Sequence, residues 1–313
     1  PLTVWTKAEG IEAENEDYLL LISGGGSRRH CYQNFQTEST QDWTLQIVTF
    51  NSFEATEIEL SLGASLAKSG TIWFDGLQVK PAGLLQLVRT ECKPFAVTSA
   101  DHSVTYEEGK DFEPVIGGRS TAMGGHRHGP QPAASAEPVM PGITLTKDSR
   151  IKDGDKLLVS FYHTAVIYDS QSVCSVEDPK ILEIMEDQAK RMAEIWPTGA
   201  YFMNYDEIRI GGWELQPGGA HLKPGELLAG HVSKAVGFIR KYSPGATVYA
   251  WSDMFDPTHN ARPFARRKGY YYLCNGNWDG AWKGLPADVV IMNWNGTENA
   301  ADSLKRFGSI GHK

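Results

Sequence analysis

Long apolar runs are absent from this sequence. No window approaches the roughly 20 uninterrupted apolar residues that a membrane helix needs, so a membrane partner is not expected. Basic residues are also few: 30 Lys and Arg stand against 38 Asp and Glu, which gives a formal net charge of -8. A nucleic-acid backbone or an anionic membrane calls for clustered Lys and Arg, so the charge favours a neutral or cationic partner.

Cysteine is scarce and scattered, at Cys31, Cys92, Cys174 and Cys274. The absence of a CxxC pair excludes the usual zinc-ribbon spacing and leaves the redox compartment open. His126 and His128 form H-R-H in a Gly- and Pro-rich loop, but no third ligand sits nearby, so neither a metal nor a cofactor is predicted. The sequence also lacks a Walker A loop, a GxGxxG motif after a strand and an HExxH motif, which removes support for phosphate, nicotinamide and zincin chemistry.

The sequence does contain enough apolar residues for a sizeable core, since 41% of its 313 residues are hydrophobic. Residues 1–83 show alternating runs such as T-L-Q-I-V-T-F with no helical period, which predicts an antiparallel β-sandwich. Residues 84–156 form a β-rich transition with a Gly- and Pro-rich loop. In residues 157–313, strands alternate with helices. Three regions are therefore expected.

The alternation in the last region predicts parallel strands joined by crossover helices. Strands are expected at residues 157–163, 200–205, 247–252 and 289–293, and helices at 178–196, 224–242 and 300–307. An α/β fold of the (β/α)8 barrel type follows, with functional residues at the carboxyl ends of the strands. Because a complete barrel takes about 250 residues, the barrel is expected to be incomplete and the chain a fragment.

Acidic and polar side chains gather where these strands end. Carboxylates transfer protons, amides and guanidinium groups bind hydroxyls, and indole rings stack on sugars, so a carbohydrate site is predicted. The candidate catalytic residues are Glu207, Asp206 and Asp253. The candidate substrate-binding residues are His163, Asn204, Arg209, Trp213, Trp251, Asn260, Asn275, Trp278 and Trp294.

The carboxylates receive separate roles. Glu207 is assigned as general acid/base because its arm is longer, Asp206 as its orienting partner, and Asp253 as a second carboxylate from the neighbouring strand. The alternative is a structural ion pair of Asp206 or Glu207 with Arg209. His163 is equally compatible with a satisfied core histidine, and the loop tryptophans with anchoring of their loops.

Several motifs resemble known families. G-T-I-W-F-D-G-L-Q-V resembles the last strand of jelly-roll carbohydrate-binding modules, which often carry a structural calcium ion, although nothing here fixes its ligands. Y-F-M-N-Y-D-E-I-R and V-I-M-N-W-N resemble the barrel of bacterial and environmental glycoside-hydrolase-like proteins. The Asp-Glu dyad is similar to that of glycoside hydrolase family 20, in which Glu is the acid/base and Asp positions the acetamido group. F-M-N-Y stands here in place of that family's H-x-G-G.

The expected protein is a secreted or periplasmic glycoside hydrolase with a jelly-roll accessory domain, acting on a polysaccharide or oligosaccharide. A carbohydrate-binding protein without catalysis is the alternative. An esterase has no support, because no Ser or Cys occupies a nucleophile elbow. The sugar, the linkage and the oligomeric state stay open.

Overall fold

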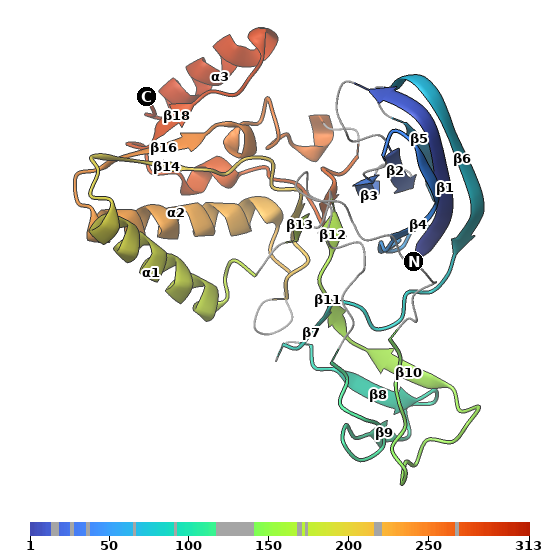
Figure 1. Cartoon of the computed structure of the whole chain (residues 1–313). Helices are drawn as coiled ribbons and strands as arrows, with labels where there is room; N and C mark the ends of the chain where they lie inside the picture. Colours follow the sequence, from blue (N-terminus) through green and yellow to red (C-terminus); the bar gives the residue numbers. More distant parts are fainter. Residues whose placement is uncertain are drawn as a thin grey trace. The chain divides into compact units, whose positions relative to one another are not determined.

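A computed structural model describes residues 1–13, 19–25, 28–35, 38–64, 67–90, 93–116, 141–167, 171–172, 175–215, 221–266 and 269–313. Cys92, Cys174, His126 and His128 lie outside these ranges. The chain divides into two compact units (Figure 1). Unit 1 comprises Pro1–Gly26 and His30–Ser172, and unit 2 comprises Ser27–Arg29 and Val173–Lys313. Among the described residues, no helix combines the length and apolar character that a bilayer crossing needs.

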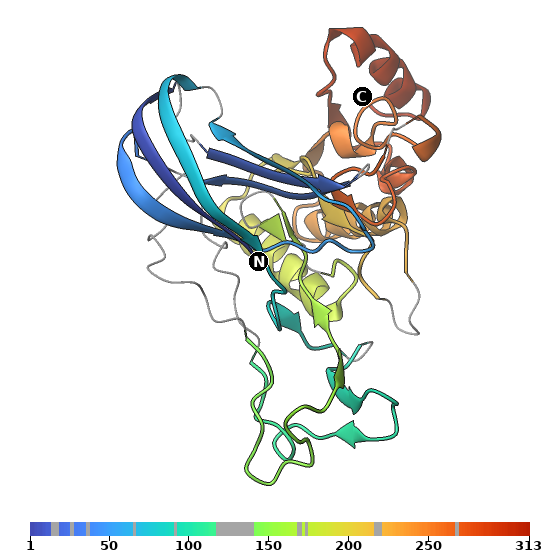
Figure 2. The same ribbon diagram turned by 90° about the vertical axis from the view of Figure 1, so that its right-hand side faces the viewer.

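Unit 1 begins with two three-stranded sheets, and the strands of the first are strongly curved (Figure 2). The first has the order β4-β1-β6, with β4 at Gln41–Val48, β1 at Leu2–Ala13 and β6 at Ala67–Val79. The second has the order β3-β2-β5, with β3 at Arg28–Phe35, β2 at Leu19–Gly25 and β5 at Glu59–Ala64. Leu2 and Val4 of β1 form a buried cluster with Cys31 of β3, so the two sheets share a core.

The rest of unit 1 consists of short strands around a second core. Strands β10 (Leu157–Ser160), β8 (Ala96–Ser99) and β9 (Thr105–Tyr106) form an antiparallel sheet. Two-residue strands form the remaining pairs: β11 (Tyr162–His163) with β7 (Leu87–Val88), and β12 (Val166–Ile167) with β13 (Gln171–Ser172). The core beneath them is built around Val97 and Phe112.

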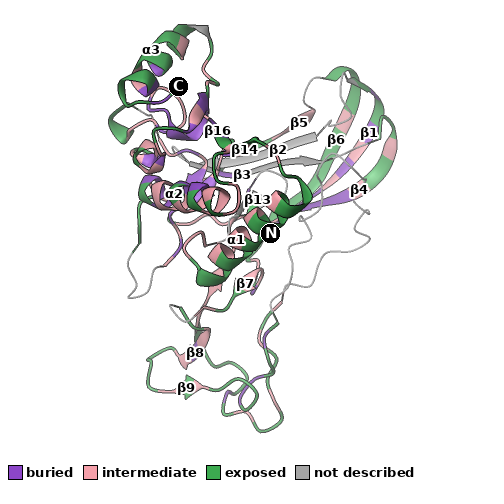
Figure 3. Cartoon of the chain, turned by 90° about the vertical axis from the view of Figure 1, so that its left-hand side faces the viewer, coloured by how far each residue is buried: buried purple, intermediate pink, exposed green. Residues whose placement is uncertain are grey.

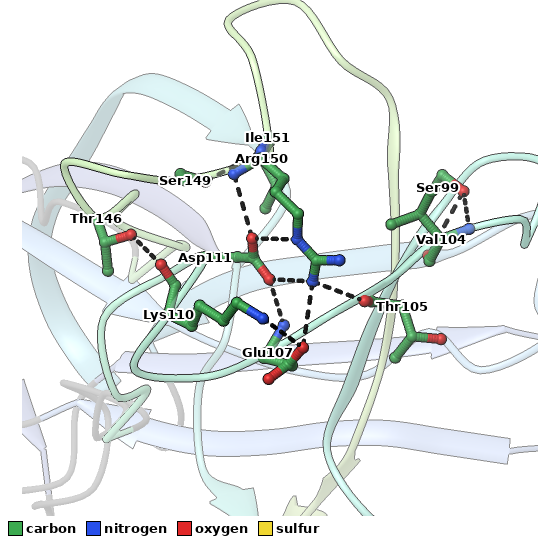
Figure 4. A network of polar contacts seen from close by, with 10 residues as sticks. All are labelled: Ser99, Val104, Thr105, Glu107, Lys110, Asp111, Thr146, Ser149, Arg150 and Ile151. Atoms are coloured by element: carbon green, nitrogen blue, oxygen red, sulfur yellow. Dashed lines mark hydrogen bonds and ion pairs between the residues drawn. The ribbon is translucent and has the colours of Figure 1, made fainter.

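A buried carboxylate stabilises the loops of this second part of unit 1 (Figure 4). The side chain of Asp111 is fully buried and accepts hydrogen bonds from Arg150 Nε at 2.8 Å and from the Glu107 backbone N–H at 2.7 Å. The backbone N–H of Arg150 donates to the same carboxylate at 3.1 Å. Because the Arg150 guanidinium bonds to the charged form, it holds the pKa of Asp111 well below the ordinary value of 3.8.

The Asp111 network predicts an acid-sensitive unit 1. A depressed pKa contributes stability that is present above about pH 3.8 and is lost as the pH falls below it. We expect Asp111→Asn to lower the melting temperature at pH 7. This difference in melting temperature should shrink as the pH falls below about 3.8. Exposed Asp148 supplies the control Asp148→Asn. Thermal melts at a series of pH values test this, and a deficit independent of pH would contradict it.

Unit 2 is built on a parallel three-stranded sheet of order β14-β16-β18. The strands are β14 (Ala200–Met203), β16 (Thr247–Trp251) and β18 (Val290–Met292). Helices α1 (Pro179–Ile195), α2 (Pro224–Tyr242) and α3 (Thr297–Ser309) surround it. The apolar stripe of α2, which includes Val232 and Val236, belongs to one buried core cluster with Ala250 of β16. In contrast, α1 has no buried residue (Figure 3).

The described residues of the connection from β16 to β18 contain no α-helix. They form three short 3-10 helices and the strand β17 (Leu273–Cys274), which pairs in parallel with β15 (Ile210–Gly211). The 3-10 helices are η1 (Asp253–Phe255), η2 (Phe264–Arg266) and η3 (Ala281–Gly284).

The predicted fold class, a jelly roll joined to an α/β barrel of the (β/α)8 type, is wrong. The described residues contain only three α-helices and several small sheets, and none of these sheets closes into a barrel. Residues 157–163, expected as a barrel strand, pair antiparallel with β8 and β7 in unit 1. An apolar run can pair in either direction, and only its partner decides which sheet it joins.

Close backbone contact fixes α2 against η3. A Cβ on Gly225 would lie 2.0 Å from the carbonyl oxygen of Asp279, and one on Gly284 would lie 1.9 Å from that of Ala229. Neither position has room for a side chain, so these glycines set the distance between the two segments.

Two glycines of α2 form a matched test of this packing. We expect Gly225→Ala to destabilise unit 2 by about 1–3 kcal/mol, because the added methyl group must displace backbone atoms. Gly237 has nothing within 4 Å of a built Cβ. Gly237→Ala should therefore stabilise the helix by about 0.5–1 kcal/mol. Chemical denaturation of both variants checks this, and equal effects would contradict the packing argument.

Candidate functional site

The ends of the three parallel strands of unit 2 are cross-linked by hydrogen bonds. The backbone N–H of Glu207, after β14, donates to Asp253 Oδ2, after β16, at 3.0 Å. The backbone N–H of Trp294, after β18, donates to the Ser252 hydroxyl at 2.8 Å. Because parallel strands end at the same edge, the sheet brings together residues far apart in sequence. These segments form the candidate site.

Arg209 lies at the centre of the acidic turn that follows β14. Its guanidinium forms an ion pair with the Glu207 carboxylate and also contacts the Tyr272 ring, whose centroid lies 5.4 Å from Cζ. Parallel pairing of β15 with β17 brings Arg209 beside Tyr272. The Leu273 N–H, next in sequence to Tyr272, donates to the Arg209 carbonyl oxygen at 3.1 Å. The Arg209 side chain is 11% exposed and that of Glu207 is 45% exposed, so the carboxylate is the part that solvent reaches.

Both partners of Arg209 have an unusual backbone conformation. Glu207 has φ of 38° and Tyr272 has φ of 49°, and within the described part of unit 2 they are the non-glycine residues with positive φ. Such a conformation costs about 1–3 kcal/mol and persists only where the surroundings fix it. Strain of this kind concentrates at functional sites.

Asp253 is a buried carboxyl group beneath this turn, with 1% of its surface exposed. Its Oδ2 accepts hydrogen bonds from Glu207 N–H and from Asn260 Nδ2 at 3.1 Å, while Oδ1 has no hydrogen-bond partner among the described residues. Burial raises the pKa of Asp253 above the ordinary 3.8, and the charge of Asp206 raises it further against the effect of the two hydrogen bonds.

Two further acidic groups of unit 2, Tyr271 and Glu214, are buried. Burial raises the pKa of the Tyr271 phenol well above the ordinary 10, and the negative charge of Glu207 adds to this effect. Burial also raises the pKa of Glu214, whose carboxylate accepts the Gly212 N–H at 2.9 Å. Neutral Tyr271 and the charged pair of Glu207 and Arg209 thus lie in one region.

Aromatic rings continue the site across one face of the sheet. The Trp251 ring lies 5.0 Å from that of Phe202 and 4.6 Å from that of Trp294, centroid to centroid. Phe202 is 48% exposed and Trp294 is 46% exposed. We call these three rings the aromatic row. Large exposed apolar rings are the surfaces on which sugar rings stack.

Other predicted residues make contacts inside the fold. Trp278 is 3% exposed and packs against Gly211, where a Cβ would lie 2.7 Å from its ring. Trp213 Nε1 donates to the Leu273 carbonyl, and Asn275 Nδ2 donates to the Gly212 carbonyl at 3.0 Å. These contacts anchor the Gly-rich loops.

His163 belongs to unit 1. Its Nε2 lies 2.7 Å from Asn51 Nδ2, and its Nδ1 lies 3.2 Å from the Thr164 carbonyl oxygen. Unit 2 therefore assembles its strand-end cluster from its own residues. Asn204 and Asp206 are exposed there, and the Asp206 N–H donates to Asn204 Oδ1 at 3.2 Å.

Sequence reasoning missed Asp256, which holds the strand ends in place. It is fully buried and accepts hydrogen bonds from the Thr258 backbone N–H at 2.7 Å and from the side chains of Asn295 and Ser303. The sequence reasoning also assigned no roles to Tyr271, Tyr272 and Glu214. The only sequence signal for the tyrosines was their repetition, which does not show which of them approaches Arg209.

Comparisons with protein-family models and with curated protein sequences give no match for this chain. The resemblance to barrel glycoside hydrolases, including the family 20 dyad, is wrong: the described residues form small sheets with three helices and no barrel. Within the described residues, no three His, Cys, Asp or Glu side chains lie close enough to hold a metal ion.

The raised pKa of Asp253 predicts a pH-dependent stability difference. Stability from such a group is fully present below its unfolded-state pKa of about 3.8 and is lost as the pH rises through its folded-state pKa. Asp253→Asn cannot ionise and keeps an oxygen that accepts the Glu207 N–H. We expect this variant to gain stability relative to the wild type as the pH rises from about 4 to 7.

Urea denaturation followed by tryptophan fluorescence measures this gain. Exposed Asp302 of α3, which is not among the groups that shift the pKa of Asp253, supplies the control Asp302→Asn. If the free energies of unfolding of the wild type and Asp253→Asn differed by the same amount over this pH range, burial would not raise the pKa of this carboxyl group.

Proposed function

We propose that unit 2 binds a carbohydrate at its strand-end cluster and hydrolyses a glycosidic bond by carboxylate catalysis. The observation that carries this proposal is the strained Glu207 turn, held by Asp253 below and by Arg209 at its side chain. The strained backbone costs free energy and holds a half-exposed carboxylate in a fixed position at a strand end. Strain of this kind is found where the position of a side chain matters for function. The catalytic surface is an open sheet, not a barrel.

The aromatic row supports a carbohydrate as the substrate. Its rings lie on one face of the sheet, and exposed Asn204 and Asp206 follow β14, the strand that carries Phe202. Rings that stack on the CH face of a sugar, beside amides and carboxylates that bind its hydroxyls, are the complementary surface for a carbohydrate. A charged or wholly apolar substrate would not bind both the aromatic rings and the amides and carboxylates beside them.

Exposure divides the roles among the carboxylates. A group that transfers a proton to the departing oxygen must touch the substrate. Glu207, with a side chain that is 45% exposed, and exposed Asp206 satisfy this condition, and Asp253 does not. We therefore assign Glu207 as the proton-transfer group, Asp206 as the second substrate-facing carboxylate and Asp253 as the residue that positions the Glu207 turn.

Carbohydrate binding without turnover is the second candidate. The ion pair between Glu207 and Arg209 favours it, because a carboxylate already bound to a guanidinium is less available for proton transfer. Under this alternative the aromatic row binds the sugar and the acidic turn only shapes the surface.

Substitution of Glu207 separates the two candidates. On a panel of p-nitrophenyl glycosides and oligosaccharides, we expect Glu207→Gln to reduce kcat by about 100-fold or more, since general acid–base groups contribute about 10²–10⁴. Binding of an oligosaccharide, measured by calorimetry, should persist. Exposed Glu298 in the first turn of α3 supplies the control Glu298→Gln, which should retain full activity.

The control and the pH profile complete this test. If Glu207→Gln turned over substrate at the wild-type rate, Glu207 would be excluded from catalysis. Binding without turnover on the whole panel would favour the second candidate. Asp253→Asn should shift the pH profile of kcat, which a merely structural residue would not do.

A further inference from the structure

A cavity of about 390 Å³ lies along β14, at the edge of the parallel sheet, between α1 and α2. Met185 and Met192 of α1 form one wall, and Ala235 and Phe238 of α2 form another. All five residues from 201 to 205 contribute to the lining, so the cavity reaches both faces of the strand. Its volume falls in the range of about 300–1,000 Å³ that is typical of small-molecule sites.

The lining is uncharged. It contains apolar and aromatic side chains together with a few neutral polar groups and no Asp, Glu, Lys or Arg. The Tyr205 hydroxyl lies 3.1 Å from His231 Nδ1, and the Tyr201 hydroxyl lies 3.0 Å from the Ser243 hydroxyl. Burial lowers the pKa of His231, which keeps the imidazole neutral at neutral pH. A neutral, mainly apolar occupant fits this lining.

The wall formed by α1 is adaptable. No residue of α1 is buried, and Met192 is 50% exposed. Methionine side chains are flexible and polarisable, and they adjust to ligands of different shape. The cavity therefore suits a class of apolar groups of similar size.

The cavity adjoins the candidate site. Its lining residue Asn204 accepts the backbone N–H of Asp206, and Tyr205 directly precedes the acidic turn. Phe202 belongs to both the cavity lining and the aromatic row, through its contact with Trp251. A ligand that spans both surfaces would have one apolar part and one sugar part.

We propose that this cavity binds the neutral aryl or alkyl aglycone of a glycoside, while the sugar lies on the aromatic row. This inference rests on the proposed function, because it names the substrate class of the same site. The glycosidic bond would then lie near the segment from Asn204 to Glu207, which joins the two surfaces. A substrate made only of sugar would leave the uncharged cavity without a matching group.

Binding of a free aglycone tests the cavity independently of turnover. The probe is 4-methylumbelliferone, a neutral aromatic molecule, titrated into the full chain and followed by its fluorescence. Ala189 lines the cavity from α1, so Ala189→Phe should fill it and weaken binding at least 10-fold. Exposed Lys190 is the neighbouring position outside the lining, and Lys190→Phe should leave the affinity unchanged.

A second variant guards against misfolding of the first. Ala235→Leu fills the cavity from α2 and should weaken binding in the same direction. Glu207→Gln should bind the probe as the wild type does, because it acts outside the lining.

The outcomes separate the cavity from the catalytic proposal. Absence of probe binding to the wild type, or equal binding by Ala189→Phe, Ala235→Leu and wild type, overturns the cavity as a binding site. Probe binding that both filling variants remove supports the cavity. If the wild type then cleaves no 4-methylumbelliferyl glycoside, the proposed hydrolysis fails while the site for a neutral aromatic group stands.

Discussion

The site in unit 2 depends on the hydrogen bond between the Glu207 backbone N–H and the buried carboxyl of Asp253. This bond joins the ends of β14 and β16 and holds Glu207 in the left-handed conformation that a glutamate rarely adopts. The side chain of Glu207 then faces Arg209, which packs over Tyr272. Loss of the bond would relieve the backbone strain of the turn. The Glu207 carboxylate would then no longer be held in one direction.

Packing on the other side of the sheet makes this geometry possible. Glycines at 225 and 284 allow α2 to approach the segment from Asp279 to Gly284 until the backbones touch, which fixes this segment against the helix. The opposite face keeps its aromatic row exposed, since none of the three helices buries Phe202 or Trp294. The aromatic row is thus left open to a ligand.

Local features of this chain were predictable from its sequence, and long-range ones were not. The strands predicted at 200–205 and 247–252 correspond to β14 and β16, which begin at the predicted residues and end at Met203 and Trp251, because apolar runs followed by acids are local signals. The barrel failed because the run 157–163 is equally compatible with an antiparallel partner more than fifty residues away. Trp278 was predicted from its Gly-rich loop, but the missing side chain at Gly211 gives its ring a place in the core.

The most direct test of the account is whether a carbohydrate contacts the aromatic row. Two-dimensional NMR resolves the indole N–H signals of the nine tryptophans, which single substitutions assign. Titration with an oligosaccharide or an aryl glycoside should shift the signals of Trp251 and Trp294 and leave that of buried Trp278 in place. Saturable shifts that leave out both Trp251 and Trp294 would contradict the account.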